Sequence, residues 1–409
     1  MKALIAVASF AQNLSGLQRH AFNVARCLLL QPEISALHLV IAPWQMDLIS
    51  QASLPNDVRL FTHIGNMAPN SFSRNLWYIR ELPKIAAQLG VDVVHFSYPM
   101  PVNARAFRCP TVVSLHDLYP YEIPRNFGFP KYIFNRLVLQ QCLRQADAIA
   151  CVSEATYSGL RRYVPDHVSR RSIRIYNCVE PSSSLSTESP IPGWNEEPYL
   201  LCIAQHRRNK NIPLLIKAFD LLLRSGQIES ATKLVVIGIP GPETSAIQRL
   251  ISTTGLNNKV HLLEGVSEPS LQWCYSNCEA LVAPSAIEGF GLPVAEGLLA
   301  GCRVVCSDIP AHREIGDGAC HFVDLNNETE VALAYAISAA LRKPKNLPIS
   351  LPQLSAEVLS KQYLAMYRRL IVLASQAHGS SNADSIDGAA SGNPVDAPDH
   401  CFATQYREK

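Results

Sequence analysis

The sequence predicts an α/β protein of two doubly wound parallel-sheet domains that face each other across a cleft. Short apolar runs alternate with longer helix-patterned stretches, and a Ser/Pro-rich segment interrupts this alternation near the middle of the chain. Such runs are typical of parallel strands that helices cover on both faces. A chain of 409 residues also exceeds one ordinary core, which favours two domains.

The first half of the chain predicts one complete domain, residues 1–178. Its strand candidates are residues 3–9, 36–42, 91–97, 111–117 and 147–153. Helical patterns at 17–30 and 132–146 lie between these strands. The segment 172–184 ends the unit, and a Ser/Pro-rich linker follows it.

The second half restarts the alternation and predicts a second domain, residues 179–355. Its strand candidates are residues 199–205, 233–239, 260–265, 280–285, 303–308 and 320–325. Residues 356–375 have helical apolar spacing and are expected to close the fold. Residues 376–409 are poor in hydrophobics and predict a disordered tail.

The charge balance excludes a general attraction to nucleic acid, because the formal net charge is only +2. Residues 375–409 hold five acids and two bases, which leaves +5 on residues 1–374. That mild excess suits an anionic ligand or a membrane surface. No uninterrupted apolar run approaches the roughly 20 residues of a membrane span.

The cysteines and the start of the chain indicate a cytoplasmic protein. Most of the twelve cysteines lie in apolar runs, as reduced core thiols do. The pairs Cys274/Cys278 and Cys302/Cys306 lack zinc-site spacing, so we expect no metal. The opening MKALIAVASFA could pass for a signal peptide, but a buried first strand explains it better.

The stretch IEGFGLPVAEGLLAG, residues 287–301, combines two carboxylates with a glycine turn. Gly289 and Gly291 let a ligand approach the backbone closely, and the following proline suits a helix start. Helix N-termini bind anions, while Glu288 and Glu296 can accept hydrogen bonds from hydroxyls. The stretch therefore predicts a site for a polyhydroxylated ligand with an anionic middle.

The longer segment APSAIEGFGLPVAEGLLAGCRVVCSDIPAHREIGD closely resembles the donor-binding segment of retaining glycosyltransferases of family 4. Those enzymes have the GT-B fold, in which two Rossmann-like domains face each other and a C-terminal helix packs back toward the N-terminal domain. The resemblance implies that Glu288 lies near the donor sugar and that Glu296 binds the ribose hydroxyls. It implies that the turn between them meets sugar and phosphate through Gly289, Phe290, Gly291 and Leu292.

The segment YLLCIAQHRRNKNIPLLIKAF resembles the family's strand, basic loop and helix, where an Arg/Lys pair grips the diphosphate. Lys210 and Asn211 match the family's Lys-Asn. The arginine that usually precedes them is Asn209 here, so Arg208 or Arg207 must take that role. Fixed cations stabilise the charge that develops on the leaving diphosphate.

Two N-terminal segments complete the resemblance. In TVVSLHDLYPYEIP, His116 matches a strand-ending histidine that faces the donor sugar and is expected to bond a sugar hydroxyl. A general-base role is less favoured, since retaining members use the donor phosphate to accept the proton. In FAQNLSGLQRHAFNVA, Gly16 keeps half of the family's Gly-Gly anion loop, and Ser15 replaces the other half.

Two further stretches could touch a membrane. Residues 71–89 mix basic and aromatic side chains, but a core-packed helix is favoured over a peripheral membrane contact. Residues 161–174 contain five arginines, which indicates a solvated loop or a contact with anionic lipid or a lipid-linked diphosphate.

The resemblance covers roughly residues 1–375 and implies a retaining, metal-independent hexosyltransferase without a cofactor. Its co-substrate would be a GDP- or UDP-sugar, and the transferred sugar would be mannose. The acceptor would be a glycan or a lipid-linked sugar in bacterial surface polysaccharide synthesis. The alternative is a catalytically inactive nucleotide-sugar-binding subunit of a glycan-synthesis complex. A dinucleotide oxidoreductase is disfavoured because no G-x-G-x-x-G follows a strand.

Overall fold

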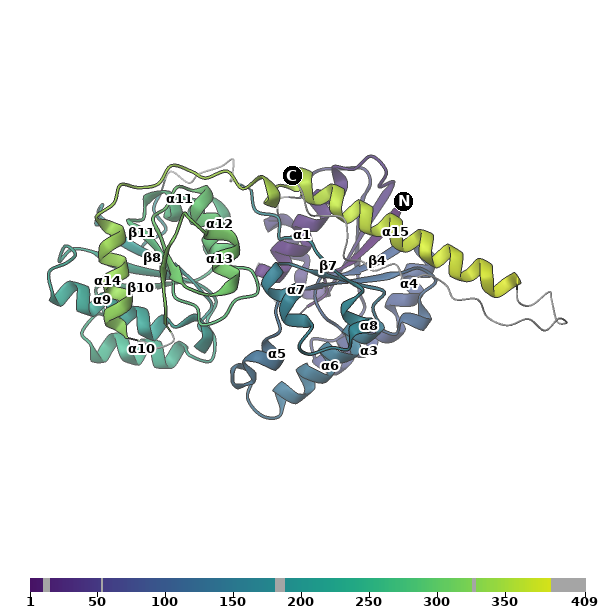
Figure 1. The fold of residues 1–409 in the computed structure, drawn as a ribbon, viewed down its shortest axis with the longest axis horizontal. Helices are drawn as coiled ribbons and strands as arrows, with labels where there is room; N and C mark the ends of the chain where they lie inside the picture. The colour runs from purple at the N-terminus through teal and green to yellow at the C-terminus, as the bar shows by residue number, and fades with distance from the viewer. Residues whose placement is uncertain (10–14, 53, 181–187, 326–328, 384–409) are drawn as a thin grey trace.

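The computed structural model describes residues 1–9, 15–52, 54–180, 188–325 and 329–383, with side chains as far as residue 376. Two parallel-sheet domains lie side by side, and the C-terminal helix returns across the N-terminal one (Figure 1). The predicted α/β class with two doubly wound sheets is confirmed.

The N-terminal sheet has the strand order β3-β2-β1-β4-β5-β6-β7, and all neighbouring pairs are parallel. The strands are β1 (Lys2–Ala6), β2 (Ala36–Ile41), β3 (Leu60–Ile64), β4 (Val93–Phe96), β5 (Thr111–Leu115), β6 (Ala148–Cys151) and β7 (Ser172–Arg174). The sequence did not predict the two edge strands, β3 and β7. β3 has no fully buried residue and β7 has one, so neither has the continuous buried run that marks the inner strands.

Helices cover both faces of this sheet. On one face lie α1 (Gly16–Leu29), α2 (Met46–Gln51) and the C-terminal helix. The other face, which we call the outer helix layer, carries α3 (Ser71–Arg80), α4 (Leu82–Leu89), α6 (Lys131–Gln145), α7 (Glu154–Leu160) and α8 (Asp166–Ser169). Trp77 and Tyr78 are buried beneath this layer, which confirms the core-packed interpretation of residues 71–89.

The C-terminal sheet has the order β10-β9-β8-β11-β12-β13 and is also parallel. Its strands are β8 (Tyr199–Ile203), β9 (Lys233–Ile237), β10 (Val260–Leu263), β11 (Ala280–Ala283), β12 (Val304–Ser307) and β13 (His321–Val323). Its helices are α9 (Ile212–Arg224), α10 (Thr244–Thr253), α11 (Glu268–Asn277), α12 (Leu292–Leu299), α13 (Pro310–Gly316) and α14 (Glu330–Leu341). The strand order reverses between β8 and β11, and the loops that leave these two neighbours border the crevice where such sheets bind ligands.

The C-terminal helix α15 (Ala356–Ala383) packs against α1 of the N-terminal domain, as predicted (Figure 1). Tyr363 and Tyr367 are fully buried there. The helix continues to Ala383, so the predicted start of the tail at residue 376 is wrong. The rest of that tail, residues 384–409, lies outside the described residues.

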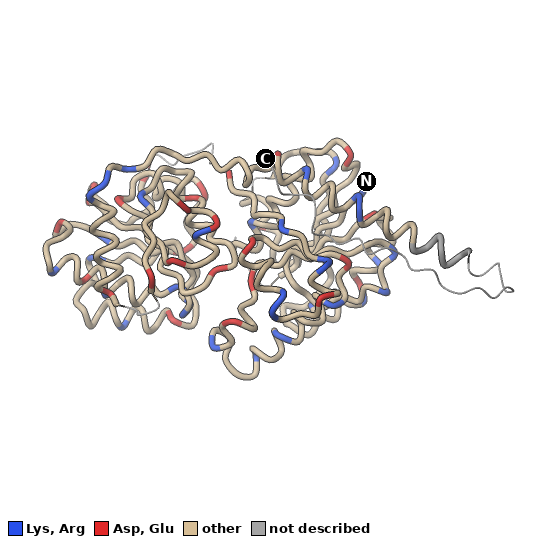
Figure 2. Tube along the Cα trace, in the orientation of Figure 1, with Lys and Arg blue, Asp and Glu red and all other residues tan. Residues whose placement is uncertain are grey.

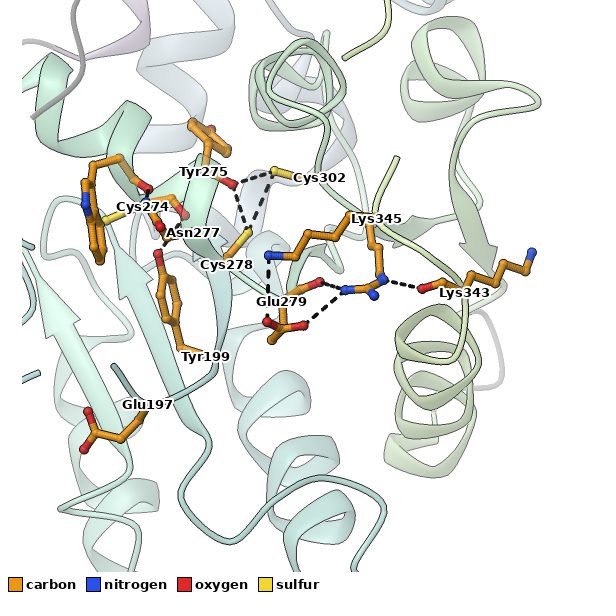
Figure 3. A network of polar contacts seen from close by, with 12 residues as sticks. Glu197, Tyr199, Cys274, Tyr275, Asn277, Cys278, Glu279, Cys302, Lys343 and Lys345 are labelled. Atoms are coloured by element: carbon orange, nitrogen blue, oxygen red, sulfur yellow. Dashed lines mark hydrogen bonds and ion pairs between the residues drawn. The ribbon is translucent and has the colours of Figure 1, made fainter. Parts of the chain in front are cut away.

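One cysteine of each predicted pair, Cys278 and Cys302, meets the other in the packing of the C-terminal domain. At the amino ends of β11 and β12, the sulfurs of Cys278 and Cys302 lie 3.8 Å apart and both face the carbonyl oxygen of Tyr275 (Figure 3). Among the described residues, no group of three or more His, Cys, Asp or Glu side chains is placed to hold a metal ion. None of the described helices is both long and apolar enough to span a bilayer.

Candidate functional site

The candidate site lies where the carboxyl-end loops of the two sheets meet. Lys210 ends the short turn after β8, and Glu288 stands in the loop after the neighbouring strand β11. The Lys210 Nζ donates to Oε1 of Glu288. From the N-terminal domain, the Tyr119 hydroxyl donates to Oε2 of Glu288 at 3.1 Å. The reversal of strand order therefore joins two segments that are 78 residues apart.

Glu288 is an anion at neutral pH although its side chain is only 11% exposed. Burial raises its pKa, but the Lys210 charge, His312 and hydrogen bonds from Lys210 and Ser285 outweigh that effect, so the pKa is lowered. Sequence reasoning missed Tyr119, which stands three residues after His116. Tyr119 and Glu288 lie in different domains, so their hydrogen bond could be predicted only from the way the domains dock.

The glycine turn touches the N-terminal domain directly. A Cβ atom on Gly289 would lie 1.7 Å from the carbonyl oxygen of His116, so no side chain fits there. The Gly289 carbonyl accepts hydrogen bonds from the hydroxyls of Ser153 and Thr156, the latter at 3.0 Å. Gly289 is thus a point of close contact between the two domains at the site.

Glu296 also faces the other domain. Its Oε1 lies 3.7 Å from Nη1 of Arg19, which reaches over from α1 and pairs with Glu268 at 2.7 Å. The Tyr275 hydroxyl donates to the second oxygen of Glu296 at 2.6 Å. Burial raises the pKa of Glu296, and the Arg19 charge opposes the rise. The sequence singled out the start of α1 but not Arg19, whose role depends on the docking of the domains.

His116 has one ring nitrogen that can accept a hydrogen bond. Its Nε2 lies 2.8 Å from the carbonyl oxygen of Ser97, which can only accept, so Nε2 carries the proton and Nδ1 is an acceptor. Burial lowers the pKa of His116 to about 4. The neutral ring can accept a hydrogen bond from a hydroxyl, but it is a weak base at neutral pH.

Behind His116 runs a buried hydrogen-bond chain that fixes two more histidines. The His20 ring meets the His116 ring edge-on, with centroids 4.5 Å apart. Ser114 Oγ lies 2.7 Å from Nε2 of His20 and 2.8 Å from Nε2 of His95. His20 Nδ1 lies 2.7 Å from the Asn177 side-chain oxygen.

The direction of each hydrogen bond in this network follows from the outermost partners. His20 donates from Nδ1 to the Asn177 oxygen, so its Nε2 accepts from Ser114. Ser114 then has only lone pairs for His95, which donates from Nε2. The remaining nitrogen of His95 accepts from the hydroxyl of Tyr367 on α15 at 2.6 Å. The closing helix thus supports the strand that carries His116.

We expect stability to fall as the pH falls below about 6.5, because these histidines must stay neutral. Burial lowers the pKa of His95 to about 3 from an ordinary 6.5, so the unfolded chain binds a proton that the native protein excludes. Between pH 7.5 and 5 this costs about 2 kcal/mol for His95. Urea unfolding at both pH values should show the loss, reduced in His95→Gln. The exposed His167→Gln is the control, and equal pH dependence in both variants would contradict the prediction.

Other predicted residues differ in how they face the site. The Phe290 ring is buried in an apolar cluster with Val152 and Val179, so only its backbone is available to a ligand. The Asn211 side chain donates to the carbonyl oxygen of Pro284 at 2.9 Å, which ties the two site loops together. A Cβ on Gly16, the first residue of α1, would lie 3.7 Å from Leu292.

The remaining predicted residues, Gly291 and the two arginines Arg207 and Arg208, were expected to bind the anionic part of the ligand. Gly291 has a positive φ of 95° and caps the start of α12, a conformation that favours glycine. Arg208 is exposed, and Arg207 is only partly so. The Arg207 charge acts on Asp117, whose pKa burial raises to about 6. Arg207 therefore lies nearer to the cleft residues than Arg208 does.

Glu314 forms a further contact between the domains. Its carboxylate accepts from the backbone N–H groups of Glu154 at 2.6 Å and Ala155 at 3.1 Å, at the start of α7. A carboxylate at a helix N-terminus is stabilised by unpaired N–H groups and by the dipole. This contact was not predicted, because the sequence does not show which helix faces α13.

Two parallel-sheet domains face each other here, with cations and carboxylates gathered where their loops meet, as in two-domain proteins of the doubly wound α/β class. Residues 14–183 match the family described as Glycosyltransferase Family 4, and residues 186–348 match Glycosyl transferases group 1. The chain belongs to this family of glycosyltransferases and has the GT-B fold.

Curated relatives agree with this family. The O-antigen chain mannosyltransferase RfbU of Salmonella typhimurium is 25% identical over 280 residues, which cover 65% of this chain and 71% of that protein. The O-antigen chain mannosyltransferase B of Escherichia coli is 24% identical over 338 residues, which cover 80% of this chain and 87% of that protein.

Solved structures share the fold at lower identity. WaaG, a glycosyltransferase involved in lipopolysaccharide biosynthesis, aligns with a TM-score of 0.63 at 16% identity, covering 95% of this chain and 100% of WaaG. Anabaena HepE in complex with UDP-glucose aligns with a TM-score of 0.61 at 16% identity, covering 94% of this chain and 100% of HepE. At such identity the likeness concerns the fold alone.

Proposed function

We propose that this glycosyltransferase moves mannose from a nucleotide diphosphate sugar to a glycan or lipid-linked acceptor during bacterial surface polysaccharide synthesis. The observation that carries the proposal is the Lys210–Glu288 pair at the strand-order reversal, beside His116 of the facing domain. Two curated relatives named as O-antigen mannosyltransferases favour the sugar and the pathway class. Synthesis would take place at the cytoplasmic face of the membrane.

In this proposal, different groups of the cleft hold the diphosphate, the sugar and the ribose of the donor. The diphosphate takes the Lys210 ammonium as its partner, with Arg207 and the N-termini of α1 and α12 adding positive potential. Glu288 is then free to accept hydrogen bonds from the sugar hydroxyls. Glu296 takes the ribose hydroxyls, in keeping with the family resemblance. These cations would neutralise the leaving diphosphate without a metal ion.

We expect retention of the anomeric configuration, as the family resemblance implies, and two of the three candidate bases in the cleft are poorly suited to an inverting reaction. An inverting enzyme needs a general base for the acceptor hydroxyl, and His116, with a pKa of about 4, is too weak for that task. Glu288 already shares its oxygens with Lys210 and Tyr119. In a retaining reaction the donor phosphate would accept the proton. Asp117, with a pKa near 6, is the carboxyl that an inverting reaction would use.

A donor screen tests this proposal. We expect GDP-mannose to raise the melting temperature by mass action more than the UDP-hexoses do. Transfer to an acceptor extract should yield an α-linked product by NMR and should persist in EDTA. A β-linked product that Asp117→Asn abolishes would overturn retention. Donor binding without transfer or hydrolysis would instead support a catalytically inactive binding subunit.

A further inference from the structure

Large apolar side chains gather on the surface at the start of α6. The exposed fractions are 81% for Phe129, 40% for Ile133, 51% for Phe134 and 57% for Leu137. Ile133 and Leu137 are one helical turn apart and Phe134 lies next to them, so together they form a stripe on the solvent side of the helix. A contiguous apolar patch on a soluble domain marks an interaction site more often than single exposed residues do.

The same segment is purely basic. Residues 123–145 contain no Asp or Glu, and their four cations are all exposed: Arg125, Lys131, Arg136 and Arg144. Figure 2 shows Lys and Arg positions along this part of the N-terminal domain. Apolar side chains that enter a bilayer interface while flanking cations meet anionic headgroups are typical of peripheral membrane binding. Lys and Arg stems can lie along the apolar surface and keep their charges in the headgroup layer.

The patch begins beside the cleft. Asn126 donates to the side-chain oxygen of Asn209 in the C-terminal domain at 2.9 Å. Tyr119, a few residues earlier in the chain, bonds Glu288. A surface bound through α6 would therefore lie close to the mouth of the site. A lipid-linked acceptor could reach the cleft without leaving the membrane.

A second basic feature lies on the same outer helix layer. Arg80, Lys84 and Arg108 line a hollow of about 430 Å³ together with apolar residues that include Pro83. The loop that carries Arg108 is tied to α6, because the Gln141 side chain accepts from the Val102 N–H at 3.0 Å. Such a hollow suits the phosphate of a lipid headgroup.

We propose that the apolar and basic surface at the start of α6 docks this protein on a bilayer that contains anionic phospholipid. The α6 surface lies outside the stretches 71–89 and 161–174, which the sequence singled out, whereas the hollow takes Arg80 and Lys84 from residues 71–89. The acceptor's route rests on the proposed function, whereas lipid binding itself does not.

Vesicle sedimentation of the full chain tests the docking. We expect binding to phosphatidylglycerol vesicles and little binding to pure phosphatidylcholine. Phe134→Asp should weaken binding at least about tenfold, because the burial of one large apolar side chain is lost and a like charge faces the lipid. The matched control is Tyr335→Asp on α14, an exposed aromatic residue of the other domain, which should bind as the unaltered protein does.

Three results would overturn the docking: no preference for anionic vesicles, equal binding by both variants, or loss of a dimer by Phe134→Asp in size-exclusion chromatography with lipid binding unchanged. The last would identify the patch as an interface between copies. The melting-temperature rise with GDP-mannose should be the same in both variants. If no nucleotide sugar shifts the melting temperature but Phe134→Asp still abolishes lipid binding, the proposed donor fails and the docking stands.

Discussion

Lys210→Ala is expected to lower kcat by about 10²- to 10³-fold, the usual cost of removing one preorganised group that stabilises developing charge. The ammonium lies at the strand-order reversal and is only 17% exposed, so water cannot easily replace it. Removal also leaves Glu288 buried without its cation, which should raise the pKa of that carboxyl. Initial rates of transfer at saturating donor measure the effect.

The control for this variant is Lys217→Ala. Lys217 lies on α9, a short distance along the chain from Lys210, and is exposed to solvent. Its replacement should leave kcat within twofold or so of the unaltered enzyme, as is usual for surface changes. If Lys210→Ala kept more than about a tenth of the unaltered kcat, the cation would not be the main stabiliser of the leaving group.

Gly289→Ala is expected to prevent the close docking of the two domains. The added Cβ would meet backbone atoms of His116, at 1.7 Å from the oxygen and 2.8 Å from the carbon, and backbone cannot rotate away as a side chain can. The domains must therefore separate. A misplacement of about 1 Å can cost 10²-fold in rate, so kcat/KM should fall by about that factor. Small-angle X-ray scattering should report a larger radius of gyration.

Gly226→Ala separates this steric effect from backbone strain. Gly226 has a positive φ of 65°, and a Cβ there would meet nothing within 4 Å. The change should lower the melting temperature through local strain and leave kcat/KM and the radius of gyration unaltered. If Gly289→Ala behaved in the same way, the contact with His116 would not limit the reaction.

Much of the fold follows from local pattern. Buried strands such as β8 and β11 have an apolar residue at every position, and parallel strands place the loops after them on one edge of the sheet. The motifs of Lys210 and Glu288 could therefore be assigned to one crevice. The strand β3 was missed because its edge position leaves its side chains partly exposed.

Contacts between domains could not be predicted in this way. Arg19 reaches Glu296, and Glu314 caps α7, only because the two domains dock at one particular angle. Phe290 stands between two site glycines in the sequence, yet its ring packs into an apolar cluster between the domains. Similarly, Arg207 and Arg208 are equivalent in a motif but differ in exposure once the turn after β8 is formed.

The sequence by itself determined the two-sheet architecture, the closing helix and the loops that carry Lys210, Glu288 and His116, because hydrophobic periodicity and helix-start signals are properties of short segments. Only the tertiary structure decided which side chains meet across the interface, the tautomer of His116 and the basic apolar surface of α6. Those features depend on the relative placement of segments far apart in the chain, and residue order alone does not specify that placement.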